Sequence, residues 1–266
     1  MRAITVRALV PPRLNVPRVF GTTLAIYGTN PWIVLPVAIV AAFVPAAGEI
    51  FIAHQLPDAW AALVTTTIDG FATALFAGCG EELVHRWEEG QRRIPLKGVL
   101  AKVPGVLIPL VIVGFLQALA VAVGLVLLFV PGFVVLTFLS VVGPVVVAEH
   151  SGVRGAFRRS VQLVRGSAWR VFAVMLAVEV LAALVGIAVA LILSTLGEKP
   201  DEPVGLALGE TFTLPLEALA VPVMYWRLRE KEQAEHRHAG GDGHEGGREN
   251  EEDGQPPDGI SEHRPA

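Results

Sequence analysis

Cysteine and charge are both scarce in this sequence, and each shortage excludes a class of protein. The only cysteine is Cys79, so the chain is not a scaffold held by intrachain disulfides. Only 17% of the 266 residues are charged, whereas a soluble domain usually carries about a quarter. The hydrophobic share is 53%, and this excess of apolar surface needs lipid. The composition therefore excludes a soluble enzyme and a nucleic-acid-binding protein with a basic soluble face.

Catalytic motifs are absent as well. The sequence has no His-Glu-x-x-His pair for zinc, no Gly-x-Ser-x-Gly turn and no phosphate-binding loop that ends in Gly-Lys-Ser or Gly-Lys-Thr. We therefore expect no enzymatic activity, no cofactor, no metal site and no nucleic-acid partner.

The apolar residues are concentrated upstream of the C-terminal stretch. Residues 231–266 carry four basic and ten acidic residues, a net charge of −6, and contain seven glycines and no aromatic residue. Such a segment has too little apolar surface to offset the entropy of ordering it. We predict that residues 231–266 form a disordered, acidic, glycine-rich tail.

Six upstream segments are long and apolar enough to cross a bilayer, which needs roughly 20 apolar helical residues. They are residues 32–53, 59–80, 106–129, 133–148, 171–193 and 206–226, with a tight turn at Pro131 and Gly132 between the third and the fourth. We predict an all-α fold, a polytopic transmembrane helix bundle with six spans over residues 32–230. Residues 1–31 precede it as an N-terminal segment, with a short interfacial helix from Arg18 to Tyr27.

The basic residues support this number of crossings. Six spans place 20 of the 21 Lys and Arg residues on one side and leave Lys199 alone on the other. Basic residues gather on the cytoplasmic side of membrane proteins. We therefore expect a multi-pass protein of the plasma membrane or the bacterial inner membrane, with both termini in the cytoplasm.

The segment between the fourth and fifth spans predicts an amphipathic helix. Val153, Phe157, Val161 and Val164 fall within about 80° on a helical wheel, beside an arc of arginines. The helix is expected to lie in the membrane interface. Its basic residues either fix the orientation of the loop or contact anionic lipid headgroups. The candidate lipid contacts are Arg154, Arg158, Arg159, Arg165 and Arg170.

Several stretches of this region resemble one family. The stretches are Val130-Pro131-Gly132, residues 144–149, residues 156–166 with their Arg158-Arg159-Ser160 and Leu163-Val164-Arg165-Gly166 runs, and Trp169-Arg170. They resemble a mostly uncharacterised family of prokaryotic six-helix integral membrane proteins, whose members resemble the membrane domain of glycerophosphoryl diester phosphodiesterases. The resemblance covers residues 18–230 and implies fold and location. It implies no catalysis, because that chemistry belongs to a separate soluble domain.

Asp69, Glu179 and Glu217 are acids that lie near the middle of predicted spans. Acids are costly in the membrane, so these residues form a candidate intramembrane polar site. Either they are packed, hydrogen-bonded groups or they serve a proton or cation pathway. The leading hypothesis is a non-enzymatic structural, lipid-associated or accessory protein whose partners are membrane lipids. The alternative is a small proton- or cation-coupled transporter or channel that uses these acids.

Overall fold

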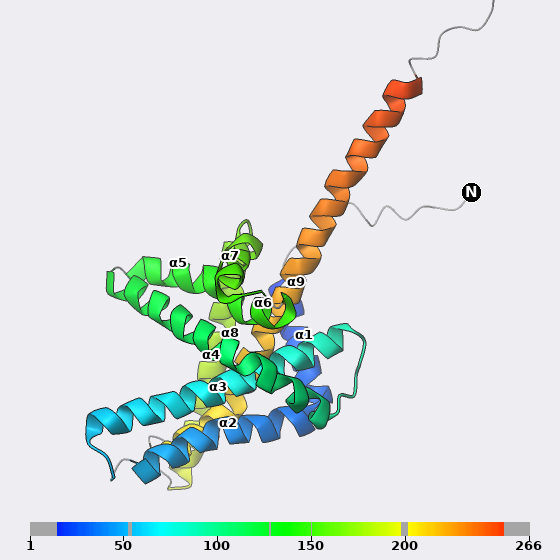
Figure 1. Cartoon of the computed structure of the whole chain (residues 1–266). Coiled ribbons are helices and arrows are strands. Elements are labelled where there is room, and N and C mark those ends of the chain that lie inside the picture. Colours follow the sequence, from blue (N-terminus) through cyan, green and yellow to red (C-terminus); the bar gives the residue numbers. More distant parts are fainter. Residues whose placement is uncertain (1–14, 53–54, 128, 150, 198–201, 253–266) are drawn as a thin grey trace, which may run out of the picture. The chain divides into compact units, whose positions relative to one another are not determined.

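The computed structural model describes residues 15–52, 55–127, 129–149, 151–197 and 202–252 (Figure 1). The predicted features that fall on residues 1–14 and 253–266, and Lys199, lie outside these ranges. The described residues form helices joined by short turns and contain no strand, so the all-α prediction is confirmed. The helices are α1 (Val16–Thr29), α2 (Pro31–Ile52), α3 (Asp58–Glu88), α4 (Leu96–Leu127), α5 (Phe129–Leu139), α6 (Val142–Glu149), α7 (Val153–Val164), α8 (Ala168–Thr195) and α9 (Pro203–Glu252).

Six helical segments among the described residues are long and apolar enough to cross a membrane, as the sequence predicts. Each overlaps one predicted span, although the second and third are longer than predicted at the ends that face each other. The segments are Pro31–Ile52, Trp60–Glu88, Leu96–Val126, Val130–Glu149, Ala168–Thr195 and Pro203–Arg237. The chain is therefore a multi-pass membrane protein.

The prediction of a turn at Pro131 and Gly132 is wrong, because both residues lie inside α5. Helix α5 begins at Phe129, so both residues lie in its first turn, where the missing N–H of proline would have no helical partner anyway. The two helices approach closely here, because a Cβ on Gly124 would lie 2.9 Å from the Cα of Gly132. Glycine at both positions permits this contact.

The fourth span is broken between α5 and α6, at Ser140 and Val141. Pro144 explains the break, because it has no N–H to donate to the carbonyl of Ser140 and its ring crowds that carbonyl. Helix α7 compensates in part: the Ser160 hydroxyl donates a hydrogen bond of 2.7 Å to the carbonyl oxygen of Phe138. Carbonyls freed inside a membrane protein need such partners.

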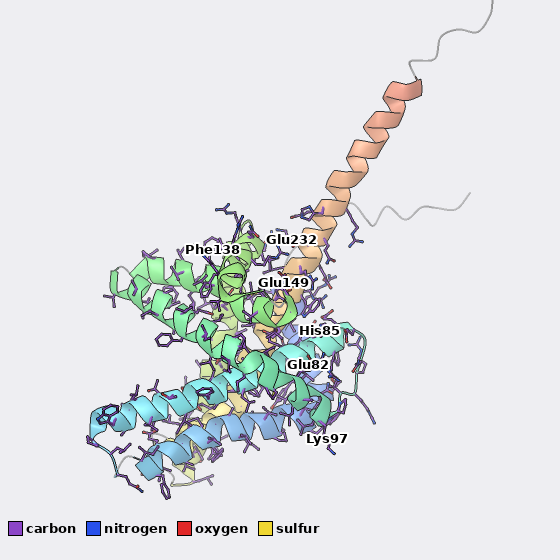
Figure 2. All side chains as sticks on the ribbon, viewed as in Figure 1. Glu82, His85, Lys97, Phe138, Glu149 and Glu232 are labelled. Atoms are coloured by element: carbon purple, nitrogen blue, oxygen red, sulfur yellow. The ribbon has the colours of Figure 1, made fainter. Side chains whose placement is uncertain are left out.

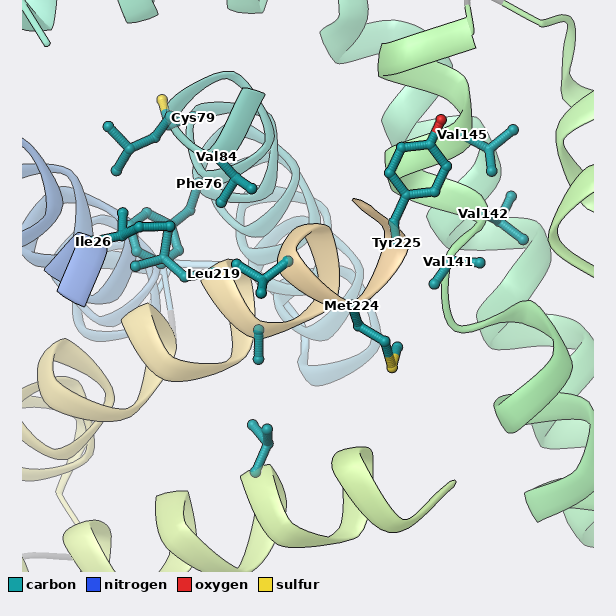
Figure 3. Packing of buried hydrophobic residues seen from close by; sticks show 14 of the residues in the cluster. Ile26, Phe76, Cys79, Val84, Val141, Val142, Val145, Leu219, Met224 and Tyr225 are labelled. Atoms are coloured by element: carbon teal, nitrogen blue, oxygen red, sulfur yellow. The ribbon is translucent and has the colours of Figure 1, made fainter. Parts of the chain in front are cut away.

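The core of the unit Leu14–Leu228 is built around the apolar part of α9. Leu219, Met224 and Tyr225 are at most 2% exposed and belong to the same cluster as buried residues of α1, α3 and α6 (Figure 3). Helices α3 and α9 approach each other closely at Gly80, because a Cβ on this residue would lie 2.6 Å from the carbonyl oxygen of Ala218.

The predicted amphipathic helix is present as α7. Its apolar side packs against protein: Ala156, Leu163 and Val164 are buried, and Val153 and Phe157 pack against the same core. Helices α5 and α6 supply most of this contact. The predicted N-terminal helix is present as α1, which buries Val19 and Ile26.

Helix α9 continues past Leu228 to Glu252, which corrects the prediction of disorder for residues 231–252. The sequence argument weighed only apolar burial. Extending an existing helix avoids the cost of nucleation, and an i,i+4 pair of Lys231 and Glu235, 3.5 Å apart, supports its first turns.

Candidate functional site

A groove of about 370 Å³ lies between α8 and α9, and three carboxylates line it. Glu179 comes from α8, and Glu210 and Glu217 come from α9. The seven residues from Glu210 to Glu217 make about two helical turns, which places both side chains on one face. We call this feature the acidic groove. The structure thus brings together Glu179 and Glu217, two of the three acids that the sequence singled out.

Asp69, the third predicted acid, is on α3 and does not line the groove. It nevertheless lies within electrostatic reach of Glu210, which in turn interacts with Glu217. Glu217 also interacts with Glu179. The four carboxylates therefore form one electrostatically connected series across α3, α9 and α8.

Small residues keep the acidic groove open. Those of α8 recur about one turn apart along the face that carries Glu179, and α9 adds two glycines. A Cβ built on Gly186 or Gly209 meets no atom within 4 Å, so neither glycine is needed for a close contact inside the described chain. The small lining residues are Ala182, Ala183, Gly186, Ala190, Gly205 and Gly209.

The four carboxylates have no hydrogen-bond partner within the described part of the chain, and no Lys or Arg lines the groove. The nearby Thr213 hydroxyl donates instead to the backbone oxygen of Glu210, at 3.5 Å. Glu217 is half-buried, whereas Asp69, Glu179 and Glu210 are exposed. A charged group exposed within a span is costly unless water or a polar partner reaches it. These groups are chemically available to exchange a proton or to hold a small cation.

The arrangement of these carboxylates does not suit multidentate metal binding. Among the residues that the structure describes, no group of three or more His, Cys, Asp or Glu side chains could hold a metal ion. The thiol of Cys79 is buried in the helix core, away from solvent.

The predicted lipid-contact arginines, which lie on α7, directly after it and on α8, divide into two groups. Arg154, Arg158 and Arg165 are exposed, as a contact with headgroups requires, and Arg170 is half-buried. Arg159 faces the protein instead: its Nε lies 3.2 Å from Oε1 of Glu149. The sequence did not separate the two groups, because Glu149 lies in α6 and the pairing depends on how α6 turns into α7.

Glu149 holds three helices together at the end of α6 (Figure 2). Besides Arg159 of α7, the hydroxyl of Tyr225 on α9 donates a hydrogen bond of 3.1 Å to the same carboxylate oxygen. This network fixes α7 against the bundle.

A second carboxylate, the buried Glu82, links α3 to α4 (Figure 2). Its Oε1 accepts a hydrogen bond of 2.7 Å from Nε of Arg86 and lies 3.2 Å from Nζ of Lys102. Arg86 also donates to the carbonyl oxygen of Gly98 at 2.9 Å. The Glu82 side chain is only 7% exposed, so this is a structural ion pair.

Sequence reasoning missed Glu210. It stands only four residues inside the predicted sixth span, where an acid at the membrane surface needs no explanation. The signal that would have found it is the seven-residue spacing to Glu217, with Thr213 between them on the same face.

Comparison with known proteins gives one match. The model of a family described as "Domain of unknown function (DUF7847)" matches residues 93–225, half of the chain. No curated protein and no solved structure matches.

Proposed function

The chain belongs to the DUF7847 family, and from the geometry of the acidic groove we propose that it is a small transporter or channel for protons or monovalent cations. The family match includes Glu179, Glu210 and Glu217 and ends before the helical C-terminal stretch. The function must therefore be argued from the residues, since the family description states none.

One observation carries the proposal: unpaired carboxylates from different membrane-spanning helices line one open groove. A packed structural acid in a membrane normally has a hydrogen-bond partner on a neighbouring helix, because an unsatisfied polar group is costly there. A relay needs the opposite arrangement, a series of acids that exchange protons or coordinate a passing ion. Asp69, Glu210, Glu217 and Glu179 meet that requirement, with Asp69 extending the series to α3.

The test is flux through the full-length protein in proteoliposomes, with an imposed proton, sodium or potassium gradient in separate arms. We expect wild-type flux above that of empty vesicles for at least one ion. Glu179→Gln and Glu217→Gln should each lower it at least tenfold, because an amide neither exchanges its proton nor carries charge.

Glu49→Gln is the matched control. Glu49 is an exposed acid of the first span, on α2, and does not line the groove, so its flux should equal that of the wild type. Wild-type vesicles that pass none of the three ions would overturn the proposal. An equal loss of ion flux in Glu49→Gln would also overturn the proposal, because the loss would then not depend on the groove.

A second role, as a lipid-associated accessory protein, is supported by three exposed arginines: Arg154 and Arg158 on α7, and Arg165 directly after it. These side chains suit anionic headgroups on the cytoplasmic face, where each basic residue near the surface adds about 1 kcal/mol. This role requires the orientation that the basic residues favour, in which both termini are cytoplasmic. The protein would then lie in the plasma membrane or the bacterial inner membrane. Reporter fusions after residues 90 and 230 should then read inside, and fusions after residues 56 and 200 outside.

A further inference from the structure

A larger cavity, of about 550 Å³, lies where α1 meets the end of α3 and α9, and three arginines line it. Arg18 comes from α1, Arg92 from the loop after α3, and Arg227 from α9. We call this cavity the arginine pocket. It shares no lining residue with the acidic groove, and none of its arginines is among the lipid contacts predicted from the sequence.

A glycine turn places Arg92. Helix α3 ends with the N–H of Gly90 bonded to the carbonyl of Trp87 and the N–H of Gln91 bonded to that of Arg86, both at 3.0 Å. Gly90 has φ +90°, a left-handed conformation that glycine adopts without strain. The reversal brings the Arg92 guanidinium over the Trp87 ring, 4.0 Å from its centroid. Such stacking orients the guanidinium before any ligand arrives.

The rest of the loop is fixed from the other side. Asn30, fully buried at the junction of α1 and α2, accepts a hydrogen bond of 3.4 Å from the N–H of Ile94 through its side-chain oxygen. The wall formed by α1 and the wall formed by the loop are therefore tied together. The arginine pocket is built by the fold.

The charges of the arginine pocket favour an anion. Arg227 lies 3.6 Å from Glu88 and donates a hydrogen bond of 3.4 Å to the Thr22 hydroxyl. Glu88 is the one acid among the lining residues, against three guanidinium groups. Arg18 and Arg92 have no carboxylate partner in the described chain. Guanidinium groups match the geometry of phosphate oxygens and bind them in pairs of parallel hydrogen bonds.

The surroundings point to a lipid as the source of the phosphate. Arg227 directly follows the apolar stretch of α9, next to Trp226, and Trp87 lies one residue before the end of the candidate span Trp60–Glu88. Tryptophan at the ends of spans lies at headgroup level. Leu24, three residues along α1 from the pocket-lining Gly21, is 52% exposed and offers an apolar surface beside the pocket. We propose that the arginine pocket binds the phosphate group of an anionic phospholipid.

Lipid retention by the full-length protein tests this proposal. Detergent-solubilised protein is equilibrated with phosphatidylglycerol or phosphatidylcholine, and bound lipid is counted by native mass spectrometry. We expect the wild type to retain at least one phosphatidylglycerol more tightly than phosphatidylcholine. Arg92→Gln should weaken that binding about fivefold, the effect of one basic residue at an anionic headgroup. Arg93→Gln, an exposed neighbour outside the pocket, makes the same charge change and should leave it unchanged.

A second variant tests the cavity without altering charge. A Cβ on Gly21 meets no atom within 4 Å, so Gly21→Leu should fill the arginine pocket and leave α1 folded. Retention of phosphatidylglycerol should fall more than tenfold. Gly28→Leu, on the same helix and equally open, is the control and should retain the lipid, because Gly28 does not line the pocket.

Free phosphate is the competing source of the ligand. Inorganic phosphate at millimolar concentration should neither displace phosphatidylglycerol nor raise the melting temperature more in the wild type than in Gly21→Leu. Stabilisation by inorganic phosphate together with equal retention of the two lipids would overturn the lipid proposal. Unchanged phosphatidylglycerol retention in both Arg92→Gln and Gly21→Leu would overturn it as well.

Discussion

Glu82 and Glu149, near the ends of α3 and α6, each contact two polar side chains from other turns or helices, and each is largely withdrawn from the surface. Glu179 and Glu217, in the acidic groove, are near each other and contact no donor within the described residues. Carboxylates of one chain are thus held in two ways. Those with partners connect helices. Those without partners are available to exchange a proton or to hold a cation.

The two kinds of carboxylate also differ in their surroundings. The carboxylates with partners join helices: Glu82 contacts Lys102 of α4, and Glu149 contacts side chains of α7 and α9. The acidic groove is lined by alanine and glycine, which fill little space. We infer that the paired carboxylates maintain the frame on which the groove depends, and the following predictions separate the two kinds.

The largest effect is expected at Glu82. Glu82→Ala leaves the largely buried Arg86 without its carboxylate, and breaking a buried ion pair from one side costs about 3 kcal/mol of unfolding free energy. Unfolding of the purified protein in mixed micelles, followed by circular dichroism, measures it. Lys102→Ala is the control: its side chain is 61% exposed, so its loss should cost less than about 1 kcal/mol. An equal loss of unfolding free energy in the two variants would mean that the burial of Glu82 does not determine its contribution to stability.

Most of the fold could be predicted from sequence patterns. Apolar run length and the distribution of Lys and Arg depend only on composition along the chain, so all six spans could be found from them. The end of α9 could not, because helix propagation past Leu228 does not require apolar residues. The break at Ser140 and the pairing of Arg159 with Glu149 depend on how separate helices pack, which periodicity does not encode.

The candidate site was predictable only in part. Depth in the membrane singled out Asp69, Glu179 and Glu217, since an acid far from either interface is conspicuous. Their mutual arrangement was not readable, and Asp69 lies beside the groove and does not line it. The arginine pocket was not predicted at all, because Arg18, Arg92 and Arg227 are far apart in sequence and look like ordinary basic loop residues.

A smaller loss of stability is expected for a substitution at Gly80, where α3 meets α9. Gly80→Ala places a Cβ 2.6 Å from the carbonyl oxygen of Ala218, and overpacking of this kind costs about 2 kcal/mol. Because Ala218 directly follows Glu217, the displaced helix should also lower ion flux. Gly114→Ala, where a Cβ meets nothing, should leave both stability and flux unchanged. Lost stability with full flux would show that the position of α9 does not govern the groove.

The smallest change in stability is expected in the groove itself. If Glu179 and Glu217 were packed acids joined by hydrogen bonds across helices, Glu217→Gln would keep the bond and Glu217→Leu would lose it, at roughly 1 kcal/mol. With no donor near either carboxylate in the described chain, both substitutions should change the unfolding free energy by less than about 0.5 kcal/mol. The same micelle titration measures this, beside Glu82→Ala as the sensitive reference. A loss near 1 kcal/mol in Glu217→Leu, absent in Glu217→Gln, would place the groove acids with Glu82 and Glu149 as structural groups. Unchanged stability combined with lost flux in Glu217→Gln separates them, because the substitution then removes only the ability to exchange a proton or hold a cation.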